Sequence, residues 1–499
     1  MKRLMILLCA VLFLSATAKG AEPTVIKPAW EVRLPPYGYL GEPFAESDEK
    51  EYRASHEWCR KQIETARKHL LDAKRPVISP YEPRATGGLI IAATIRGPWA
   101  VPMEIDKSLQ AEARIGQLYW EFLGHNSMTS RAQQGSYRAL IESGFRLDLA
   151  ARAEQIFGHS LNGIGSVSAE RFAMVDDQAF YPRASDTKFL KPSIMLGSDW
   201  NFLEFIAPDT GKITAKLGTR HANANALSQT RFLGAPLISQ DRLFAINEKG
   251  AELRLLVLDA KHQFRWIDDD SKGIAWQTAL VSALQSTVED FPRRIHALIP
   301  IATDKLIICP THLGAVVAVN RDDHKVAWTA RYGKPEDKRF ENFSCTWRVR
   351  PLLMAGDVLV YGPPDAESLY AFKLADGKEA WKLERGKGVY LAGLHDGKAI
   401  VVESDSVRAI DVSHGKEVWK VPFEGTLTGY GAFNGDRCYQ PIGLGKNAAE
   451  GVLQVIDLKQ GKAVGRIQRA DKKEFGNLLI HKGKLISQTF ESLSVFAMP

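Results

Sequence analysis

The sequence has few cysteines, and their spacing excludes several classes of protein. Five occur in 499 residues, and no two are adjacent or form a CxxC pair. A disulfide-rich scaffold, a CxxC metal site and a CxxCH haem attachment site are therefore excluded. The spacing leaves open whether Cys59, Cys309, Cys345 and Cys438 stay free, and Cys309 with Cys345 is the pair that could form a disulfide.

Long apolar runs and several catalytic motifs are also missing. After the first 20 residues, no segment approaches the roughly 20 apolar residues that a membrane-spanning helix needs. The zinc motif HExxH is absent, Gly443–Lys446 lacks the surroundings of a P-loop, and Gly163–Val167 does not form a G-x-S-x-G elbow. The net charge of +7 is spread along the chain without a basic block, so we expect no nucleic-acid binding.

The N-terminus has the pattern of a signal peptide at 1–18. Lys2 and Arg3 precede an apolar run, and a small-residue stretch of A-x-A form ends at Ala18. Cys9 lies inside the apolar run after Leu8, where a lipidation signal has a small residue. We therefore expect a periplasmic or secreted protein that does not span a membrane.

One phrase recurs through the second half of the chain. A β-branched or aromatic strand ends at a short turn that contains Gly or His, and a Trp follows on the returning strand, which is the pattern of a β-hairpin. The three clear copies are 318–328, 371–381 and 409–419, and degenerate copies are 103–120, 205–215, 256–266 and 455–465. Most copies follow another strand pair, so each unit offers four short strands at the roughly 40- to 60-residue spacing of propeller blades.

The two ends of the sequence complement each other. The strand at 492–498 repeats the start of the phrase but lacks its Trp strand, whereas Lys27–Leu34 resembles Lys416–Pro422. We predict that an N-terminal strand at 25–34 closes the last blade and removes an exposed sheet edge. The fold class is therefore all-β, an eight-bladed propeller of four-stranded antiparallel blades over about 87–499.

The repeats resemble the tryptophan-docking motif A-x-D-x-x-T-G-x-x-x-W of the PQQ-type propeller superfamily. In that superfamily the Trp packs on a neighbouring blade and ties blades together. The resemblance implies a structural role for Trp120, Trp266, Trp328, Trp381 and Trp419, and as ordinary core aromatics they would also be buried.

Two stretches do not follow the rhythm of the blades. Apolar residues at helical spacing occur at 45–75, including Trp58, Ile63, Ala66 and Leu70, and again at about 129–157. Both are predicted to be amphipathic helices packed on the propeller, either as covers for an exposed sheet face or as a surface for a partner.

The resemblance also implies a possible chemistry, because the superfamily includes dehydrogenases that bind PQQ and calcium in the channel. The adjacent cysteine pair found in many of them is absent here. Candidate calcium ligands by residue type alone are Glu289, Asp290, Glu341 and Asn342, which fit solvated loops equally well. The histidines, among them His221 and His312, form no metal-like cluster. We therefore assign no catalytic, cofactor-binding or metal residue.

A basic and aromatic stretch could bind an acidic peptide or a glycan, although such a stretch also fits solvated surface with one buried aromatic. Its residues, with the arginines that lie near blade starts, are Arg293, Arg294, Lys338, Arg339, Phe340, Phe343, Trp347, Arg348 and Arg350.

The non-catalytic relatives by resemblance are the BamB propellers of the outer-membrane assembly machinery, which bind protein partners without a cofactor. The sequence differs from them in its extra helices and in lacking a convincing lipidation cysteine. We expect a monomeric, non-enzymatic scaffold with a protein partner and no cofactor. The alternatives are a quinoprotein alcohol or sugar dehydrogenase that uses PQQ with calcium, and a glycan- or peptide-binding sensor.

Overall fold

The computed structural model describes most of the chain. The described residues are 22–34, 46–94, 97–105, 113–121, 165–167, 172–178, 200–218, 230–239, 242–259, 273–287, 296–333 and 347–498, with single positions 109, 157, 227 and 293. The signal peptide predicted at 1–18 lies outside them. So does the helix predicted at 129–157, apart from Phe157.

The strands form eight sheets, which confirms the predicted eight-bladed propeller. The strands are given from the innermost outward. Blade one has β3 (Arg84–Thr86), β4 (Leu89–Thr94), β5 (Gly97–Pro102) and β6 (Trp120–Glu121), and blade two has β7 (Gly165–Val167), β8 (Phe172–Gln178), β9 (Trp200–Ile206) and β10 (Ile213–Leu217). Blade three has β11 (Thr230–Phe232) and β12 (Leu237–Ser239), β13 (Arg242–Lys249), β14 (Glu252–Asp259) and β15 (Ile274–Ser282), and blade four has β16 (Ile301–Ala302), β17 (Leu306–Pro310), β18 (Ala315–Asn320) and β19 (Val326–Arg331).

Blades five to eight continue the ring and include the N-terminal strands. Blade five has β20 (Leu353–Ala355), β21 (Val358–Tyr361), β22 (Ser368–Lys373) and β23 (Glu379–Glu384), and blade six has β24 (Gly388–His395), β25 (Lys398–Glu403), β26 (Ser406–Asp411) and β27 (Glu417–Pro422). Blade seven has β28 (Thr426–Leu427) and β29 (Ala432–Asn434), β30 (Arg437–Leu444), β31 (Glu450–Asp457), β32 (Lys462–Arg469) and β1 (Thr24–Ile26), and blade eight has β33 (Asn477–His481), β34 (Lys484–Gln488), β35 (Ser492–Ala497) and β2 (Trp30–Arg33).

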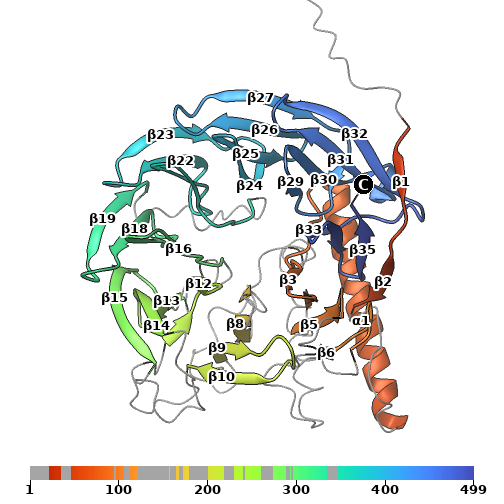
Figure 1. Ribbon diagram of the computed structural model, residues 1–499, viewed down its shortest axis with the longest axis horizontal. Helices are drawn as coiled ribbons and strands as arrows, with labels where there is room; N and C mark the ends of the chain where they lie inside the picture. Colours follow the sequence, from red (N-terminus) through yellow and green to blue (C-terminus); the bar gives the residue numbers. More distant parts are fainter. Residues whose placement is uncertain are drawn as a thin grey trace, which may run out of the picture.

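The ring is closed by the N-terminal segment, as the sequence predicts. β2 pairs antiparallel with β35, with Trp30 opposite Val495, and so supplies the outermost strand of blade eight. β1 pairs in parallel with β32 on the outer edge of blade seven. Figure 1 shows β1 and β2 running along the outside of these two blades. The closed ring leaves blade eight without the exposed edge that an incomplete sheet would have.

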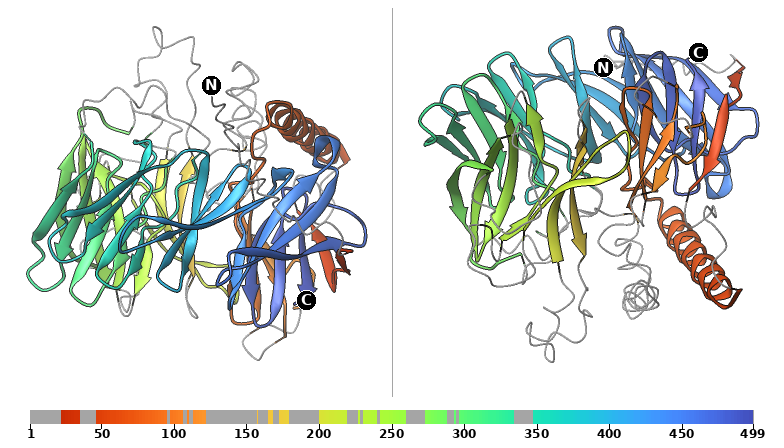
Figure 2. Two further views of the ribbon diagram at one scale, coloured as in Figure 1. Left: turned by 90° about the horizontal axis from the view of Figure 1, so that it is seen from above. Right: turned by 60° about the horizontal axis from the view of Figure 1, so that its bottom comes forward.

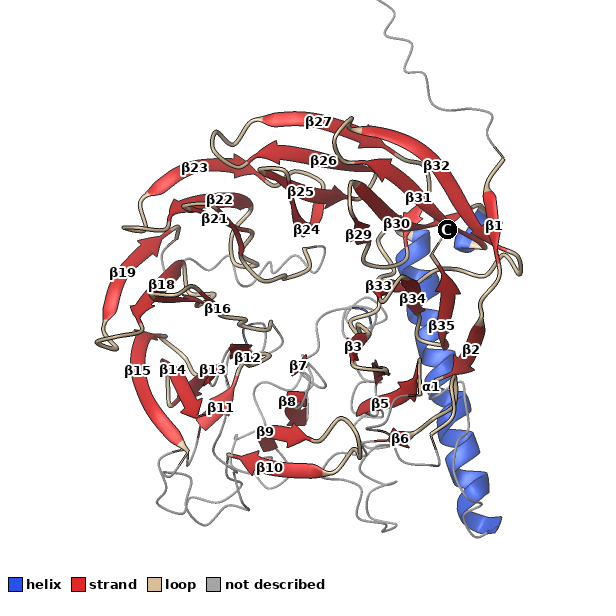
Figure 3. Cartoon of the chain, viewed as in Figure 1, coloured by secondary structure: helices blue, strands red, loops and turns tan. Residues whose placement is uncertain are grey.

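The antiparallel strands give the ring two distinct faces. Hairpin turns between third and fourth strands lie on one face, which we call the turn face. Loops between second and third strands, and the connections between blades, lie on the other, which we call the helix face because α1 (Glu46–Asp72) packs there. Figure 2 shows α1 beside the ring, and in Figure 3 it is the long helix among the described strands.

The helix α1 confirms the predicted helix but does not cover a sheet face. Ile63, Ala66 and Leu70 are buried, as their spacing predicts, and pack with Val77 and Phe157. Their neighbours are loops on the helix face, because α1 contacts the short 3₁₀ turn η4 (Lys446–Ala448) and the same cluster includes Phe490. The helix is therefore held by the loops of blades seven and eight.

The predicted docking of tryptophan on the neighbouring blade is present in the structure. Each docking glycine has a positive φ in a hairpin turn, and an added Cβ would lie 2.3–2.9 Å from the nearest indole atom of the preceding blade. The pairs are Trp30 on Gly116, Trp120 on Gly211, Trp328 on Gly377, Trp381 on Gly415 and Trp419 on Gly461. Three of the indole N–H groups also donate to backbone oxygens, those of Pro208, Leu374 and Val412, at 2.7, 2.9 and 2.7 Å.

Two hairpins have connections longer than the repeat, which the split copy at 103–120 predicts for blade one but the copy at 256–266 does not predict for blade three. In blade one the strand ends at Pro102, not near Asp106, and the turn continues to Gly116, whose N–H bonds the Pro102 oxygen at 2.9 Å. In blade three the docking position opposite Val257 is held by Trp276, not Trp266, which lies outside the described residues. Trp276 stacks on His324, at the glycine position of blade four, with ring centroids 4.3 Å apart.

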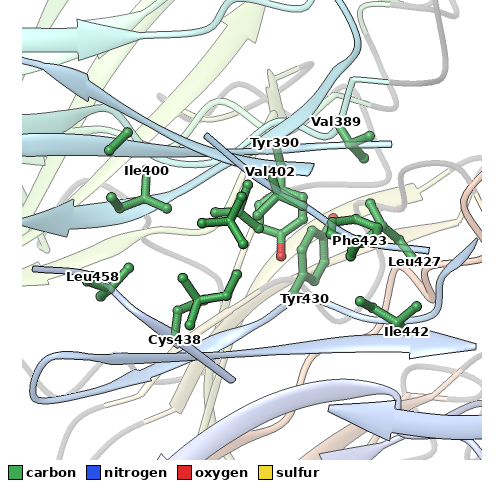
Figure 4. Packing of buried hydrophobic residues seen from close by; sticks show 14 of the residues in the cluster. Val389, Tyr390, Ile400, Val402, Phe423, Leu427, Tyr430, Cys438, Ile442 and Leu458 are labelled. Carbon is green, nitrogen blue, oxygen red and sulfur yellow. The ribbon is translucent and has the colours of Figure 1, made fainter. Parts of the chain in front are cut away.

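The hydrophobic core lies between the blades. Eight buried clusters fill the eight junctions, one between each pair of neighbouring sheets. Figure 4 shows the junction of blades six and seven, where Ile400 and Val402 face Cys438 and Ile442. Burying each such side chain contributes about 1.5–3 kcal/mol, so the sheets are joined mainly by hydrophobic packing.

Ion pairs between side chains also join blades seven and eight. Gly465 stands where blade seven would have its docking Trp. Here the buried Arg469 donates to Glu31 of β2 at 2.6 Å, to Asp471 at 2.7 Å and to Ser494 of β35 at 3.1 Å. We call these four residues the ionic joint.

Candidate functional site

The segments that lead into the innermost strands meet near the axis of the propeller on the helix face. Asn477, fully buried at the start of β33, ties three of them together. Its amide nitrogen donates to the backbone oxygens of Ser79 and Tyr81 at 2.9 and 2.7 Å, and its oxygen accepts the N–H of Tyr430 at 2.9 Å. Segment 77–84, which connects α1 to β3, is therefore fixed across blades seven and eight.

An ion pair at the end of this segment joins blade one to blade five, on opposite sides of an eight-bladed ring. The Glu82 carboxylate, two residues before β3, accepts a hydrogen bond of 2.5 Å from Arg350, three residues before β20. The side chains keep 33% and 25% of their exposure, so solvent reaches the pair. Because residues of opposite blades can touch only near the centre, this contact marks the axis of the ring.

Aromatic residues of blades six and seven hold the Arg350 guanidinium in place. The guanidinium lies 4.5 Å from the ring centroid of Tyr430, a cation–π contact. The Tyr430 ring packs edge-on against Tyr390, with centroids 4.9 Å apart (Figure 4). The Tyr390 hydroxyl donates to Gln440 at 2.8 Å and accepts the N–H of Gly431 at 2.9 Å. Arg350 is therefore supported by buried, hydrogen-bonded aromatics.

The side chains around Glu82 carry more positive than negative charge. Burial raises the pKa of Glu82, but the guanidinium groups of Arg350 and Arg84 outweigh it and hold this pKa below the usual range. Burial and the neighbouring Arg350 lower the pKa of Arg84, against the attraction of Glu82. Burial raises the pKa of Tyr430 to about 12, so it stays neutral. We call Glu82, Arg84, Arg348, Arg350, Tyr390 and Tyr430 the axial cluster; in it arginines outnumber carboxylates.

Two further groups of buried polar residues lie on the helix face between blades three, four and five. Glu248 accepts hydrogen bonds from Arg293 at 2.5 Å and from the backbone and hydroxyl of Thr287, which anchors the connection from blade three to blade four. Asp365 accepts from Tyr332 at 2.9 Å and from the Gly314 N–H at 2.8 Å, which links blades four and five. These contacts stabilise loops and converge on no common point.

The structure places the predicted residues differently from a surface loop. Trp347 is buried, and its indole N–H donates to the Gly362 backbone oxygen at 2.7 Å. Arg348 is also buried, and its backbone N–H donates to the Val389 oxygen at 2.6 Å. Trp347 is therefore a buried aromatic, as one interpretation of the stretch predicts, and Arg348 directly after the stretch is buried as well. His312 is buried in the loop between β17 and β18, near His296. Outside the described residues lie His221, Glu289, Asp290, Arg294, Lys338, Arg339, Phe340, Glu341, Asn342 and Phe343.

The four candidate calcium ligands lie outside the described residues, so the structure does not place them. Calcium needs about six to eight oxygen ligands, usually with several carboxylates. Across the described part of the chain, no three His, Cys, Asp or Glu side chains are grouped to hold a metal ion. Near the axis, Glu82 is already engaged by Arg350.

Among the described residues, the helices include none with the length and apolar character of a membrane span.

Comparison with known proteins supports the repeat type. A family model described as outer membrane protein assembly factor BamB matches residues 250–381 and 365–476. A search of curated protein sequences finds no match. With the eight blades and docked tryptophans, the family match over residues 250–476 supports a PQQ-type β-propeller.

Matches of low identity among solved structures include a designed protein, a BamB and a dehydrogenase. A computationally designed protein, Ika8, is 10% identical over 85% of this chain and 99% of its own, with a TM-score of 0.48. BamB from Moraxella catarrhalis is 15% identical over 84% and 95%, with 0.48. A europium-containing methanol dehydrogenase is 9% identical over 83% and 90%, with 0.47. Likenesses at this level do not distinguish binding from catalysis.

Proposed function

We propose that the protein is an exported, monomeric, non-enzymatic propeller that binds a protein partner through its helix face, as a BamB-like scaffold. The observation that carries this proposal is the ion pair between Glu82 and Arg350 on the propeller axis. In the related dehydrogenases the cofactor lies in this channel. Here the described groups bind one another across the ring, and the matching family model is named for an assembly factor.

The helix face offers more surface for a partner than the turn face. It carries α1, the connections between blades and the axial cluster, and the ribbon of α1 extends past the ring (Figure 2). Loops on one face of a rigid scaffold are where propellers place their binding sites.

The first experiment compares the two faces in living cells. A photo-crosslinking residue replaces either Lys61 on α1 or Lys378 in a hairpin turn on the turn face, whose side chains are 67% and 77% exposed. We expect one discrete adduct from position 61 and none from position 378. Equal adducts from both positions, or none from either, would contradict binding through the helix face.

A second experiment addresses the dehydrogenase. The purified protein is incubated with PQQ and calcium, and quinone absorbance is recorded together with dye reduction in the presence of alcohols and sugars. We expect neither stoichiometric binding nor turnover. Stoichiometric binding with turnover would contradict the scaffold function and favour the dehydrogenase.

N-terminal sequencing of the exported protein tests the signal peptide, and the mature protein is expected to start at Lys19.

A further inference from the structure

The axial cluster has unused capacity to bind an anion. A guanidinium has five N–H donors, and in the described structure Arg350 gives one hydrogen bond to a carboxylate, that of Glu82. Among the described residues, the hydrogen bond of Arg84 is a long contact of 3.5 Å to the Glu82 backbone oxygen. Two guanidinium groups thus face one carboxylate at a place that solvent reaches, which leaves a positive charge to be balanced.

The cluster is also built in advance of any ligand. The cation–π contact with Tyr430 orients the Arg350 guanidinium, and Asn477 fixes the segment that carries Glu82. An oriented guanidinium loses little conformational entropy when it binds a carboxylate, and it can do so through two parallel hydrogen bonds. Glu82 itself demonstrates that a carboxylate fits against Arg350.

We propose that the axial cluster binds a side-chain carboxylate from an acidic segment of the protein partner, and that Glu82 holds the arginines in its absence. This inference rests on the proposed scaffold function. Glu82 then acts as an internal competitor, so the incoming carboxylate shares or replaces its contact with Arg350. The net positive charge of Arg84 and Arg350 favours an acidic segment over a neutral or basic one.

The test measures binding of a fluorescent tetraglutamate peptide with amidated C-terminus to the purified protein by anisotropy, with tetraglutamine as the uncharged comparison. Glu82→Gln removes the competitor and is expected to tighten tetraglutamate binding on the order of tenfold. Glu104→Gln is the matched control, because it removes one exposed carboxylate paired with Lys482 on the turn face and should leave binding unchanged. Arg84→Gln, which keeps the pair of Glu82 and Arg350, should weaken it.

The outcomes separate the alternatives. If Glu82→Gln binds tetraglutamate no more tightly than wild type and Glu104→Gln, the cluster is a structural tie and the inference is wrong. Should Glu82→Gln not fold, unchanged binding by a folded Arg84→Gln variant has the same meaning. If free citrate binds in a manner that depends on Glu82 and Arg84 but tetraglutamate does not, the site takes a small carboxylate and the partner segment is refuted. An adduct at position 61 that survives Arg84→Gln would sink this inference while leaving the scaffold intact.

Discussion

The contact between Trp381 and Gly415 allows the docking of neighbouring blades to be measured directly. Gly415 has φ near 69°, and an added Cβ would lie 2.7 Å from two atoms of the Trp381 indole. Gly397, in the same blade, has φ near 70° but no atom within 4 Å of the added Cβ. Alanine at either position meets the same backbone strain, whereas only alanine at 415 meets the indole.

The expected energies follow from these two terms. A left-handed backbone costs a non-glycine residue about 1–2 kcal/mol, so Gly397→Ala should cost about that much. Overpacking adds about 1–3 kcal/mol, which gives about 2–5 kcal/mol for Gly415→Ala. The gain from stiffening the unfolded chain is common to both variants and cancels in their comparison.

Urea unfolding, followed by tryptophan fluorescence and circular dichroism, provides the assay. With an m-value near 3 kcal/mol per molar, a difference of 2 kcal/mol separates the two midpoints by about 0.7 M. In a Trp381→Ala background the clash is gone, so Gly415→Ala should cost no more than Gly397→Ala. Equal midpoints for the two single variants would refute the reasoning that docking requires glycine.

Three further perturbations test other contacts. Trp381→Phe should cost about 1 kcal/mol more than Trp419→Phe in urea unfolding, because the Trp381 N–H bonds a backbone oxygen and the buried Trp419 N–H has no acceptor among the described residues; equal costs would contradict this. Burial raises the pKa of Glu31, but Arg469, Ser494 and Lys473 outweigh it and lower this pKa, so its stabilisation is complete above pH 4.5 and is lost as pH falls below it. Glu31→Gln should therefore cost about 1–2 kcal/mol at pH 7 and less at pH 3, and a pH-independent cost would disprove the ionic joint. Burial raises the pKa of the Cys438 thiol to about 12 and that of Cys309 further, so neither should react with iodoacetamide by mass spectrometry until the protein unfolds; labelling of the native protein would show that these thiols open to solvent.

The fold could be predicted because its signals are local. A glycine and a Trp four positions later identify a hairpin without any long-range information, and the closing strand is identified by the likeness of Lys27–Leu34 to Lys416–Pro422. The predicted docking residue was wrong in blade three. There β14 ends at Asp259 and β15 begins only at Ile274, so the docking position falls on Trp276 and not on Trp266.

The axial cluster could not be predicted in the same way. The sequence drew attention to Arg350, but its partner Glu82 is 268 residues away and belongs to no motif. Asn477, which positions the segment of Glu82, is an ordinary strand residue in the sequence. Their proximity depends on the closure of an eight-membered ring, which places opposite blades at one axis, and no local pattern encodes that distance.

The pairing of β2 with β35 has a consequence for the kinetics of folding. It joins Trp30 to Val495, almost the longest contact the chain can make, and closing a loop of that length costs about 5 kcal/mol of chain entropy. Contacts between residues so far apart in the sequence form late in folding. Seven blades can therefore be assembled while the eighth waits with an open edge, and the nascent molecule is most vulnerable to pairing with a neighbouring chain until its N-terminal strand returns to β35.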